Sequence, residues 1–283
     1  MSEMGEGAPQ PLQGRFRLDG RAVLVTGGAG FLGAAFADAI GAAGGSPVIG
    51  DVDGARAADV AAAVERSHGV TALAVELDVT SVASITRAKE EIESRYGVLH
   101  GLVNNAAVNP KVGNEALAWP PFEKYPLEAW ATDLDVGLTG AFLCAQVFGA
   151  WMARSGGGVI VNIASDLGII APDPRLYHEK GLPDDQQPAK PASYSAAKFG
   201  LLGLTRYLAA YWAPRKVRVN ALSPAGVQAD QDPAFVERLT STIPLGRMAT
   251  LEDLQGPMVF LLGDASDFMT GANLVVDGGR TIW

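Results

Sequence analysis

Short apolar runs alternate with amphipathic stretches along the chain from Arg21 onward. A run that is apolar throughout predicts a buried strand, and apolar positions three and four residues apart predict a helix. We therefore expect strands at residues 22–25, 47–50, 71–77, 99–103, 159–163, 217–222 and 273–276. The helices expected between them span residues 31–43, 55–66, 81–96, 127–153 and 193–211.

This alternation is typical of an α/β protein whose parallel sheet is covered by helices on both faces. We predict a single-domain, Rossmann-type doubly wound parallel sheet of about seven strands. Residues 1–17 are expected to be a flexible tail and residues 18–283 to form the domain. Residues 171–191 interrupt the alternation with prolines and charges, and so long a loop in a compact domain is usually functional.

Composition and charge narrow the possible partners. Hydrophobic residues make up 48% of the chain and charged residues 19%, as in globular proteins. The formal net charge of −9 disfavours nucleic acid and anionic membranes, because both require clustered Lys and Arg. A local cation could still bind an anionic small molecule. The sequence has neither a signal-peptide pattern nor a run near the ~18 apolar residues of a membrane span, so we expect a cytoplasmic protein.

Cysteine and histidine suggest no metal or disulfide chemistry. The single cysteine, Cys144, lies in an apolar stretch, so we expect a small core residue rather than a nucleophile. A lone cysteine cannot form an intrachain disulfide, which fits a reducing compartment. The three histidines have no metal-ligand spacing, and no metal site is predicted.

A glycine-rich segment lies between the first expected strand and the first expected helix. Gly27 permits a tight turn, Gly30 lets the backbone approach a pyrophosphate, and Gly33 lets helix and strand pack closely. A pyrophosphate there would meet the free N–H groups at the helix N-terminus, near Phe31 and Leu32. The alternative is a strand-to-helix turn with no ligand.

The second expected strand is followed by Asp51, 18 residues after Gly33. A carboxylate at this position accepts hydrogen bonds from the ribose hydroxyls of a dinucleotide and repels a 2′-phosphate. Arg56 is the nearest cation that follows it. We therefore expect NAD as the cofactor, with NADP less favoured. The alternative role for Asp51 is a helix N-cap, which Asp53 would fill equally well.

Tyr194 and Lys198 are four residues apart at the start of an expected helix, so both project from one face. A phenol has a pKa near ~10, and a nearby ammonium favours the phenolate and lowers that pKa. Tyr194 could then exchange a proton with a substrate oxygen while hydride moves to or from a nicotinamide. Ser165, just after the fifth expected strand, could hydrogen-bond the same oxygen.

From Leu18 to Gly279, the sequence resembles the compact branch of the short-chain dehydrogenase/reductase family. The matching segments are residues 26–33, 51, 77–79, 104–107, 161–165, 194–198, 218–221, 223–224 and 276–279. This resemblance implies an NAD-dependent catalytic domain over residues 18–283. It implies catalytic roles for Ser165, Tyr194 and Lys198, with Lys198 also bonding the nicotinamide ribose. Further cofactor contacts are implied at Asp78 beside the adenine and at Val79, Asn104, Ala106, Pro224 and Val227.

Three departures from the family pattern affect these expectations. The glycine spacing is more like that of the longer epimerase branch, although the segment at residues 276–279 keeps the compact branch as the expectation. Gly137 stands where the family usually has an Asn that helps a water chain deliver protons to the catalytic Lys. Ala225 replaces the Gly that usually follows Pro224, which should alter the loop around the nicotinamide amide.

The substrate is expected to be small, polar and sugar-derived, because the loop at residues 171–191 is polar rather than apolar. The loop and its neighbouring sequence are similar to those of relatives associated with bacterial surface-sugar biosynthesis, including legionaminic-type sugars. If the loop closes over substrate, Arg175 and Lys180 are the expected contacts for a phosphate or carboxylate. The alternative is a solvated surface loop that faces away from the substrate.

We therefore predict an oxidoreductase that interconverts a secondary alcohol and a carbonyl. The alternatives are an epimerase or dehydratase that uses NAD transiently, or an NAD-binding protein without turnover. We also expect a homotetramer or homodimer, because the resembled family assembles through the helices at residues 127–153 and 193–211. Exposed Phe148, Trp151 and Met152 would be costly patches on a monomer.

Overall fold

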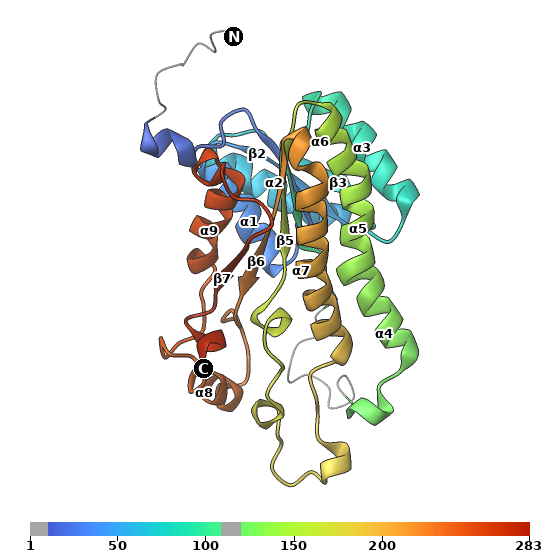
Figure 1. Ribbon diagram of the computed structural model, residues 1–283, viewed down its shortest axis with the longest axis vertical. Coiled ribbons are helices and arrows are strands. Elements are labelled where there is room, and N and C mark those ends of the chain that lie inside the picture. The colour runs from blue at the N-terminus through green and yellow to red at the C-terminus, as the bar shows by residue number, and fades with distance from the viewer. Residues whose placement is uncertain (1–10, 109–119) are drawn as a thin grey trace.

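The computed structural model describes residues 11–108 and 120–283. Within these residues the strands form a seven-stranded parallel sheet in the order β3-β2-β1-β4-β5-β6-β7, which confirms the predicted fold class (Figure 1). The strands are β1 (Ala22–Thr26), β2 (Ser46–Asp51), β3 (Leu73–Glu76), β4 (Gly101–Asn104), β5 (Gly158–Ile163), β6 (Val217–Pro224) and β7 (Asn273–Val276). The order reverses between β1 and β4, where doubly wound sheets bind their ligands beyond the strand ends.

Helices cover both faces of the sheet. They are α1 (Phe31–Ala42), α2 (Gly54–His68), α3 (Val82–Tyr96), α4 (Leu127–Leu134), α5 (Gly140–Cys144), α6 (Ala150–Arg154), α7 (Ala192–Trp212), α8 (Pro233–Thr240) and α9 (Glu252–Leu262). In Figure 1, α1 and α9 lie on one side of the sheet, and α3, α5 and α7 lie on the other. The sequence pattern did not predict α8 and α9.

The core has one layer on each face of the sheet. All five residues of β1 are buried, as a strand covered on both sides requires. One layer joins Phe36 of α1 to Met258 of α9, and the other contains Cys144 of α5. Burial raises the pKa of the Cys144 thiol to about 12, which fits the expected core residue.

The segment from α4 to α6 is one continuous helix, Leu127–Arg154, as the sequence predicted. It contains π-helical turns at Asp135–Thr139 and Ala145–Gly149. Phe148, Trp151 and Met152, which were expected to be exposed, are instead buried in the core. Their helix presents this face to the sheet, so the prediction that they form a surface patch is wrong.

The same helix is long and apolar enough to cross a membrane by length and composition. Among the helices of residues 11–108 and 120–283, this one alone is long and apolar enough to meet the criterion. Half of its most apolar stretch is buried inside the fold. Packing against the sheet accounts for the apolar face, because a core helix of a soluble domain has the same composition.

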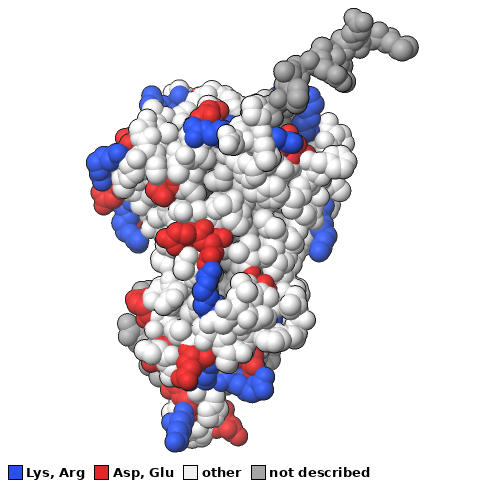
Figure 2. Space-filling model, turned by 90° about the vertical axis from the view of Figure 1, so that its left-hand side faces the viewer, with Lys and Arg blue, Asp and Glu red and all other residues white. Residues whose placement is uncertain are grey.

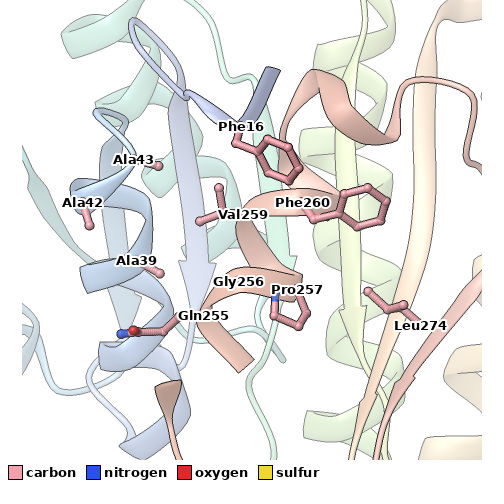
Figure 3. Close-up of a pocket in the computed structure, with 10 residues that line it drawn as sticks. All are labelled: Phe16, Ala39, Ala42, Ala43, Gln255, Gly256, Pro257, Val259, Phe260 and Leu274. Atoms are coloured by element: carbon pink, nitrogen blue, oxygen red, sulfur yellow. The ribbon is translucent and has the colours of Figure 1, made fainter. Parts of the chain in front are cut away.

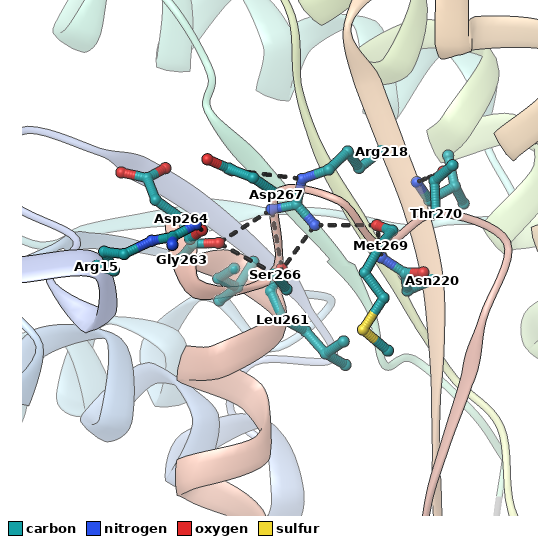
Figure 4. A network of polar contacts seen from close by, with 12 residues as sticks. Arg15, Arg218, Asn220, Leu261, Gly263, Asp264, Ser266, Asp267, Met269 and Thr270 are labelled. Atoms are coloured by element: carbon teal, nitrogen blue, oxygen red, sulfur yellow. Dashed lines mark hydrogen bonds and ion pairs between the residues drawn. The ribbon is translucent and has the colours of Figure 1, made fainter. Parts of the chain in front are cut away.

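An arginine-centred network fastens β6 to the segment that leads into β7 (Figure 4). The guanidinium of Arg218 donates to the Ser266 hydroxyl and to backbone carbonyls on either side of it. In the same region, Arg15 donates to the carbonyl of Asp264 at 2.7 Å. Because Arg15 belongs to a 3-10 helix, Leu12–Phe16, the expected flexible tail does not include these residues. Residues 1–10 lie outside the described residues.

A hollow of about 650 Å³ lies between α1, α9 and β7 (Figure 3). It is lined by Phe16, Ala39, Ala42, Ala43, Gln255, Gly256, Pro257, Val259, Phe260 and Leu274. This side of the molecule shows a broad uncharged area, with charged side chains mostly around it (Figure 2). None of the described residues in its lining is ionisable, so these residues offer no acid or base for catalysis.

Candidate active site

A cavity of about 960 Å³ opens at the carboxyl ends of the strands, where the sheet order reverses. It extends from the glycine loop and Asp51 at one end to Tyr194 and Lys198 at the other. The structure therefore brings the predicted catalytic residues into one site with the predicted cofactor residues, except that Gly33 and Asn104 do not line the cavity. Its lining includes the predicted residues Gly27, Gly30, Phe31, Leu32, Asp51, Asp78, Val79, Ala106, Ser165, Tyr194, Lys198, Pro224 and Val227.

The glycine loop has the backbone shape that its sequence predicts. Gly27 adopts φ +59°, a left-handed conformation that favours glycine. At Gly33, an added Cβ would lie 2.2 Å from the carbonyl oxygen of Gly27, so any side chain would displace the loop. Gly30 is the N-cap of α1 and supplies no side-chain cap, which leaves the helix N-terminus accessible to an anion.

The loop is also held from the next strand of the sheet. The Asn105 side-chain amide donates to the carbonyls of Thr26 and Gly27 at 3.0 and 3.1 Å. Asn105 and Ala106 also donate their backbone N–H groups to the Thr26 hydroxyl. Asn105 lines the cavity, whereas the predicted Asn104 lies beneath the lining and donates to Asn162 Oδ1 at 2.8 Å. Asn104 therefore supports the floor of the site.

Asp51 lies at the end of the cavity next to the glycine loop. Its carboxylate accepts from the backbone N–H of Ala29 at 3.0 Å and from that of Asp53 at 3.1 Å. The N-cap of α2 is Asp53, so Asp51 is not needed for the alternative capping role. Arg56 also lines the cavity, and its guanidinium donates to the Ala29 carbonyl at 2.9 Å. A carboxylate and a guanidinium thus face the same end of the site.

The catalytic candidates come from two neighbouring elements. Ser165 follows β5, and its hydroxyl accepts from the backbone N–H of Leu167 at 3.1 Å. Tyr194 and Lys198 lie in the first turns of α7, with Lys198 Nζ 5.6 Å from the centre of the Tyr194 ring. Lys198 is buried, and its Nζ donates to the Ile163 carbonyl at 2.7 Å, which fixes the ammonium under the site.

The pKa values of this pair differ from the sequence-based expectation. Burial raises the pKa of Tyr194 to about 12, and this outweighs the lowering by its hydrogen bond with Ser165. Burial also lowers the pKa of Lys198 to about 8. In the protein alone, desolvation of the phenolate is therefore the largest effect, and the pKa of Tyr194 is raised rather than lowered as the sequence led us to expect.

The cavity lining also includes residues that the sequence did not predict as part of the site, among them Asp166, Tyr177, Lys190 and Arg280. Asp166 is buried beside Ser165, whose hydroxyl donates to Asp166 Oδ1 at 2.7 Å. Asp166 Oδ2 accepts from Arg280 Nη1, although 114 residues separate the two in sequence. In the sequence, Asp166 directly follows Ser165 and Arg280 directly follows the terminal glycine pair, but neither position indicates that the two side chains pair.

The long loop does reach the active site, but not through the residues that were expected to. The Arg175 side chain is 89% exposed and is paired with Asp173 at 2.7 Å. Lys180 is exposed as well, and neither residue lines the cavity. Tyr177 and Lys190, from the same loop, do line it. The loop contains the 3-10 turns Pro174–Leu176 and Asp184–Gln186, which give it local structure.

Gly137 lies in the π-helical turn Asp135–Thr139. A Cβ added there would be 3.5 Å from the Ala197 Cβ, which is an ordinary contact. The site of the missing Asn therefore has room for at least the first atom of a side chain. Among the described residues, no group of three or more His, Cys, Asp or Glu side chains is arranged to hold a metal ion.

Comparison with known protein families agrees with this geometry. Residues 21–175 match the family model described as short chain dehydrogenase, and residues 184–281 match one described as Enoyl-(Acyl carrier protein) reductase. The first match alone spans more than half of the chain. The protein belongs to the short-chain dehydrogenase family, and it is an oxidoreductase that interconverts alcohols and carbonyls.

Individual relatives share nearly the whole chain. It is 35% identical to a D-threitol dehydrogenase of Mycolicibacterium smegmatis over 272 residues, which covers 94% of this chain and 95% of the relative. It is 32% identical to an NAD-dependent glycerol dehydrogenase of Listeria innocua, with 94% and 96% covered. A Burkholderia cenocepacia gluconate 5-dehydrogenase, solved with NADP and tartrate, superposes with a TM-score of 0.83 at 31% identity, with 96% and 100% covered.

Proposed function

We propose that this protein is a cytoplasmic, NAD-dependent dehydrogenase that oxidises a secondary alcohol on a small, polyhydroxylated substrate, and that Tyr194 is its proton carrier. The observation that carries this proposal is the shared cavity, in which the glycine loop, Asp51, Ser165, Tyr194 and Lys198 face one continuous space. A nicotinamide cofactor would supply the hydride acceptor. The chain's own residues would bind it and move the proton.

Each residue has a role that follows from its position. The N-terminus of α1 and the glycine loop would hold the pyrophosphate, and Asp51 would bond the ribose hydroxyls. Ser165 would hydrogen-bond the substrate oxygen, and Tyr194 would take its proton during oxidation. Lys198, anchored on the Ile163 carbonyl, would stabilise the phenolate that forms on Tyr194.

A phenol with a pKa of about 12 is a weak base at neutral pH. The cationic nicotinamide of the oxidised cofactor would lower that pKa, because a nearby positive charge favours the phenolate. Tyr194 is thus best suited to take the proton once cofactor is bound. Binding of the cofactor and activation of the base would then be linked, and the apo protein would not be primed for proton abstraction.

The preference for NAD over NADP rests on Asp51. Its carboxylate lines the cavity and would repel a 2′-phosphate, whereas Arg56 at the same end would attract one. Both oxygens of Asp51 already accept backbone hydrogen bonds, which hold the carboxylate at this end of the cavity. Among the relatives, the glycerol dehydrogenase is named as NAD-dependent and the gluconate dehydrogenase was solved with NADP.

The relatives named above act on threitol, glycerol and gluconate, which are polyhydroxylated molecules. This supports a polar polyol-like substrate and gives no support for a specific link to surface-sugar biosynthesis. An epimerase or dehydratase would regenerate its NAD in each cycle, so net NADH formation separates it from the dehydrogenase proposed here.

We also propose a homo-oligomer. Its contacts cannot be Phe148, Trp151 and Met152, because these residues are buried in the core. Large apolar or aromatic side chains exposed on the α4–α6 helix and on α7 are Leu127, Phe142, Phe199, Tyr207 and Tyr211. An apolar surface of this extent is costly on a monomer in water. We expect a dimer or tetramer by light scattering at micromolar concentration, and a monomeric mass would contradict this part of the proposal.

The proposed function is tested by following NADH absorbance with a panel of tetritols, pentitols, hexitols and their aldonic acids. The expected result is net NADH formation with at least one of them, and a larger kcat/KM with NAD than with NADP. Asp51→Asn should narrow that cofactor preference, because it removes the charge and keeps the shape of the side chain. Absence of turnover across the panel, or a preference for NADP, would contradict the proposal.

A further inference from the structure

The Ser165 hydroxyl has a single proton, and its hydrogen bonds show where that proton lies. Ser165 Oγ donates to Asp166 Oδ1 at 2.7 Å and accepts from the Leu167 N–H at 3.1 Å. A serine hydroxyl has one donor and two lone pairs. Ser165 therefore has one lone pair left for a further partner and no proton to give it.

Asp166 is the acceptor in this bond rather than the donor. Its Oδ1 also accepts from the Leu167 N–H at 2.8 Å, and its Oδ2 accepts from Arg280 Nη1. Both oxygens thus face donors, as expected of an ionised carboxylate that is paired with a guanidinium. The side chains of Asp166 and Arg280 are 3% and 6% exposed, so bulk water does not compete for these bonds.

The turn that carries Arg280 is fixed by its own hydrogen bonds. The Asp277 carboxylate accepts from the backbone N–H groups of Gly279 and Thr281, both at 2.8 Å. Gly279 adopts φ +90°, a left-handed conformation that favours glycine. The C-terminal turn therefore holds Arg280 in place against Asp166, which keeps the carboxylate in its ionised, accepting form.

Tyr194 supplies the second hydrogen-bonding group at this end of the cavity. Burial raises the pKa of its phenol to about 12, so the hydroxyl is protonated at neutral pH. This hydroxyl is hydrogen-bonded to Ser165. Because the Ser165 proton is already given to Asp166, Tyr194 is the donor in the bond between them. Tyr194 keeps its proton when the cofactor is reduced, since a neutral dihydronicotinamide does not favour the phenolate.

One donor and one acceptor suit an alcohol better than a carbonyl. An alcohol oxygen can accept from Tyr194 while its own O–H donates to Ser165. A carbonyl oxygen has no proton, so it gains only the hydrogen bond from Tyr194. For Ser165 to donate to it as well, the bond to the ionised Asp166 would have to break, and charge-assisted hydrogen bonds of this kind are the stronger ones.

We propose that Asp166 is a positioning residue that keeps the Ser165 proton away from the reacting oxygen, so that the complex with reduced cofactor holds the ketone product weakly and the alcohol more tightly. This inference rests on the proposed function, because it assigns a further residue of the same site. Weak binding of the ketone favours its release after oxidation. Asp166 acts through Ser165 on this release, and Tyr194 acts on proton transfer.

The test compares D-threitol with D-erythrulose, the ketone formed from it, because the two differ only at the reacting carbon. Calorimetry with protein saturated with tetrahydro-NAD, an unreactive analogue of NADH, measures binding without turnover. We expect wild-type protein to bind threitol more tightly than erythrulose. Ser165→Ala removes the acceptor, so the Kd for threitol should rise about tenfold while the Kd for erythrulose stays within about threefold.

Asp166→Asn should reverse the polarity of the site. The single amide oxygen pairs with Arg280, which leaves the amide NH2 facing Ser165 as a donor. The Ser165 proton is then free for a carbonyl oxygen, so the Kd for erythrulose divided by the Kd for threitol should fall about tenfold or more. Asp173→Asn is the matched control, because it makes the same change outside the cavity lining and should leave this ratio unchanged. Tight binding of tetrahydro-NAD by each variant shows that it is folded.

The proposal is overturned if wild-type protein binds erythrulose at least as tightly as threitol, or binds neither. It is also overturned if Ser165→Ala weakens erythrulose more than threitol, because Ser165 would then be a donor to the carbonyl. Equal effects of Asp166→Asn on both ligands would indicate a merely structural role and overturn it too. If Asp166→Asn fails to fold, Ser165→Ala still decides. The proposed function would fail differently, through the absence of NADH formation across the polyol and aldonic-acid panel.

Discussion

The ion pair between Asp166 and Arg280 offers a quantitative test of how the active site is held together. Asp166→Ala removes the carboxylate and leaves the guanidinium buried, since the two side chains are 3% and 6% exposed. Removing one partner of a buried pair typically costs about 3–5 kcal/mol, because the remaining charge is uncompensated. The Ser165 hydroxyl also loses its acceptor, but the Leu167 N–H keeps Ser165 Oγ as an acceptor at 3.1 Å.

The uncompensated charge of Arg280 is therefore the largest part of the cost. We expect Asp166→Ala to lower the free energy of unfolding by about 3–5 kcal/mol. Urea denaturation followed by tryptophan fluorescence measures this change at fixed protein concentration. The double variant Asp166→Leu with Arg280→Met should recover most of the loss, because apolar side chains of similar size can replace a buried pair at little cost.

A matched control is the exposed pair between Arg17 and Asp19, whose side chains are 50% and 63% exposed. Asp19→Ala should leave the stability unchanged, because solvent screens an exposed ion pair. A loss for Asp166→Ala no greater than that for Asp19→Ala would refute the reasoning. So would a double variant that is less stable than Asp166→Ala alone.

Two other predictions follow from local geometry. Gly33→Ala should weaken NADH binding about tenfold or more in a fluorescence titration, because the new Cβ would lie 2.2 Å from the Gly27 carbonyl oxygen. Gly256→Ala is the control and should leave NADH binding unchanged, because there is open space around Gly256. The depressed pKa of Lys190, about 8, destabilises the folded state at lower pH, so Lys190→Met should be more stable than wild type below pH 8. That advantage should shrink as pH rises from 8 towards the ordinary lysine value of 10.5, and an advantage that grows with pH would contradict it. Among the described residues, Lys198 lowers the pKa of Lys190 by its like charge, and Asp166 and Asp133 raise it.

The sequence predicted the fold because buried strands and a glycine loop have local signatures. All seven expected strands are present, although the third begins at Leu73 rather than at residue 71. The N–H of Ala72 instead donates to the side chain of Glu65, outside the sheet. The helix α9 escaped prediction, and it contains Pro257, which is rare inside helices and obscures their pattern.

The sequence was less informative where a residue's role depends on distant partners. The pairing of Asp166 with Arg280 spans 114 residues and has no local signal. Arg175 and Lys180 were the expected loop contacts, but Arg175 pairs locally with Asp173 and Lys180 is exposed. Lys190, which the sequence did not single out, lies over the Tyr194 ring. Phe148 illustrates the same limit, because an apolar residue does not reveal whether its helix face meets the sheet or a partner subunit.

The assignment of Tyr194 as the proton carrier is the central claim, and Tyr194→Phe tests it most directly. The substitution keeps the ring that Lys190 and Lys198 contact and removes only the hydroxyl. Tyr207→Phe is the matched control, since Tyr207 is exposed on the same helix. With the best substrate from the NADH assay, Tyr194→Phe should lower kcat at least about 100-fold while NADH binding is retained. A kcat within about threefold of wild type would contradict the account.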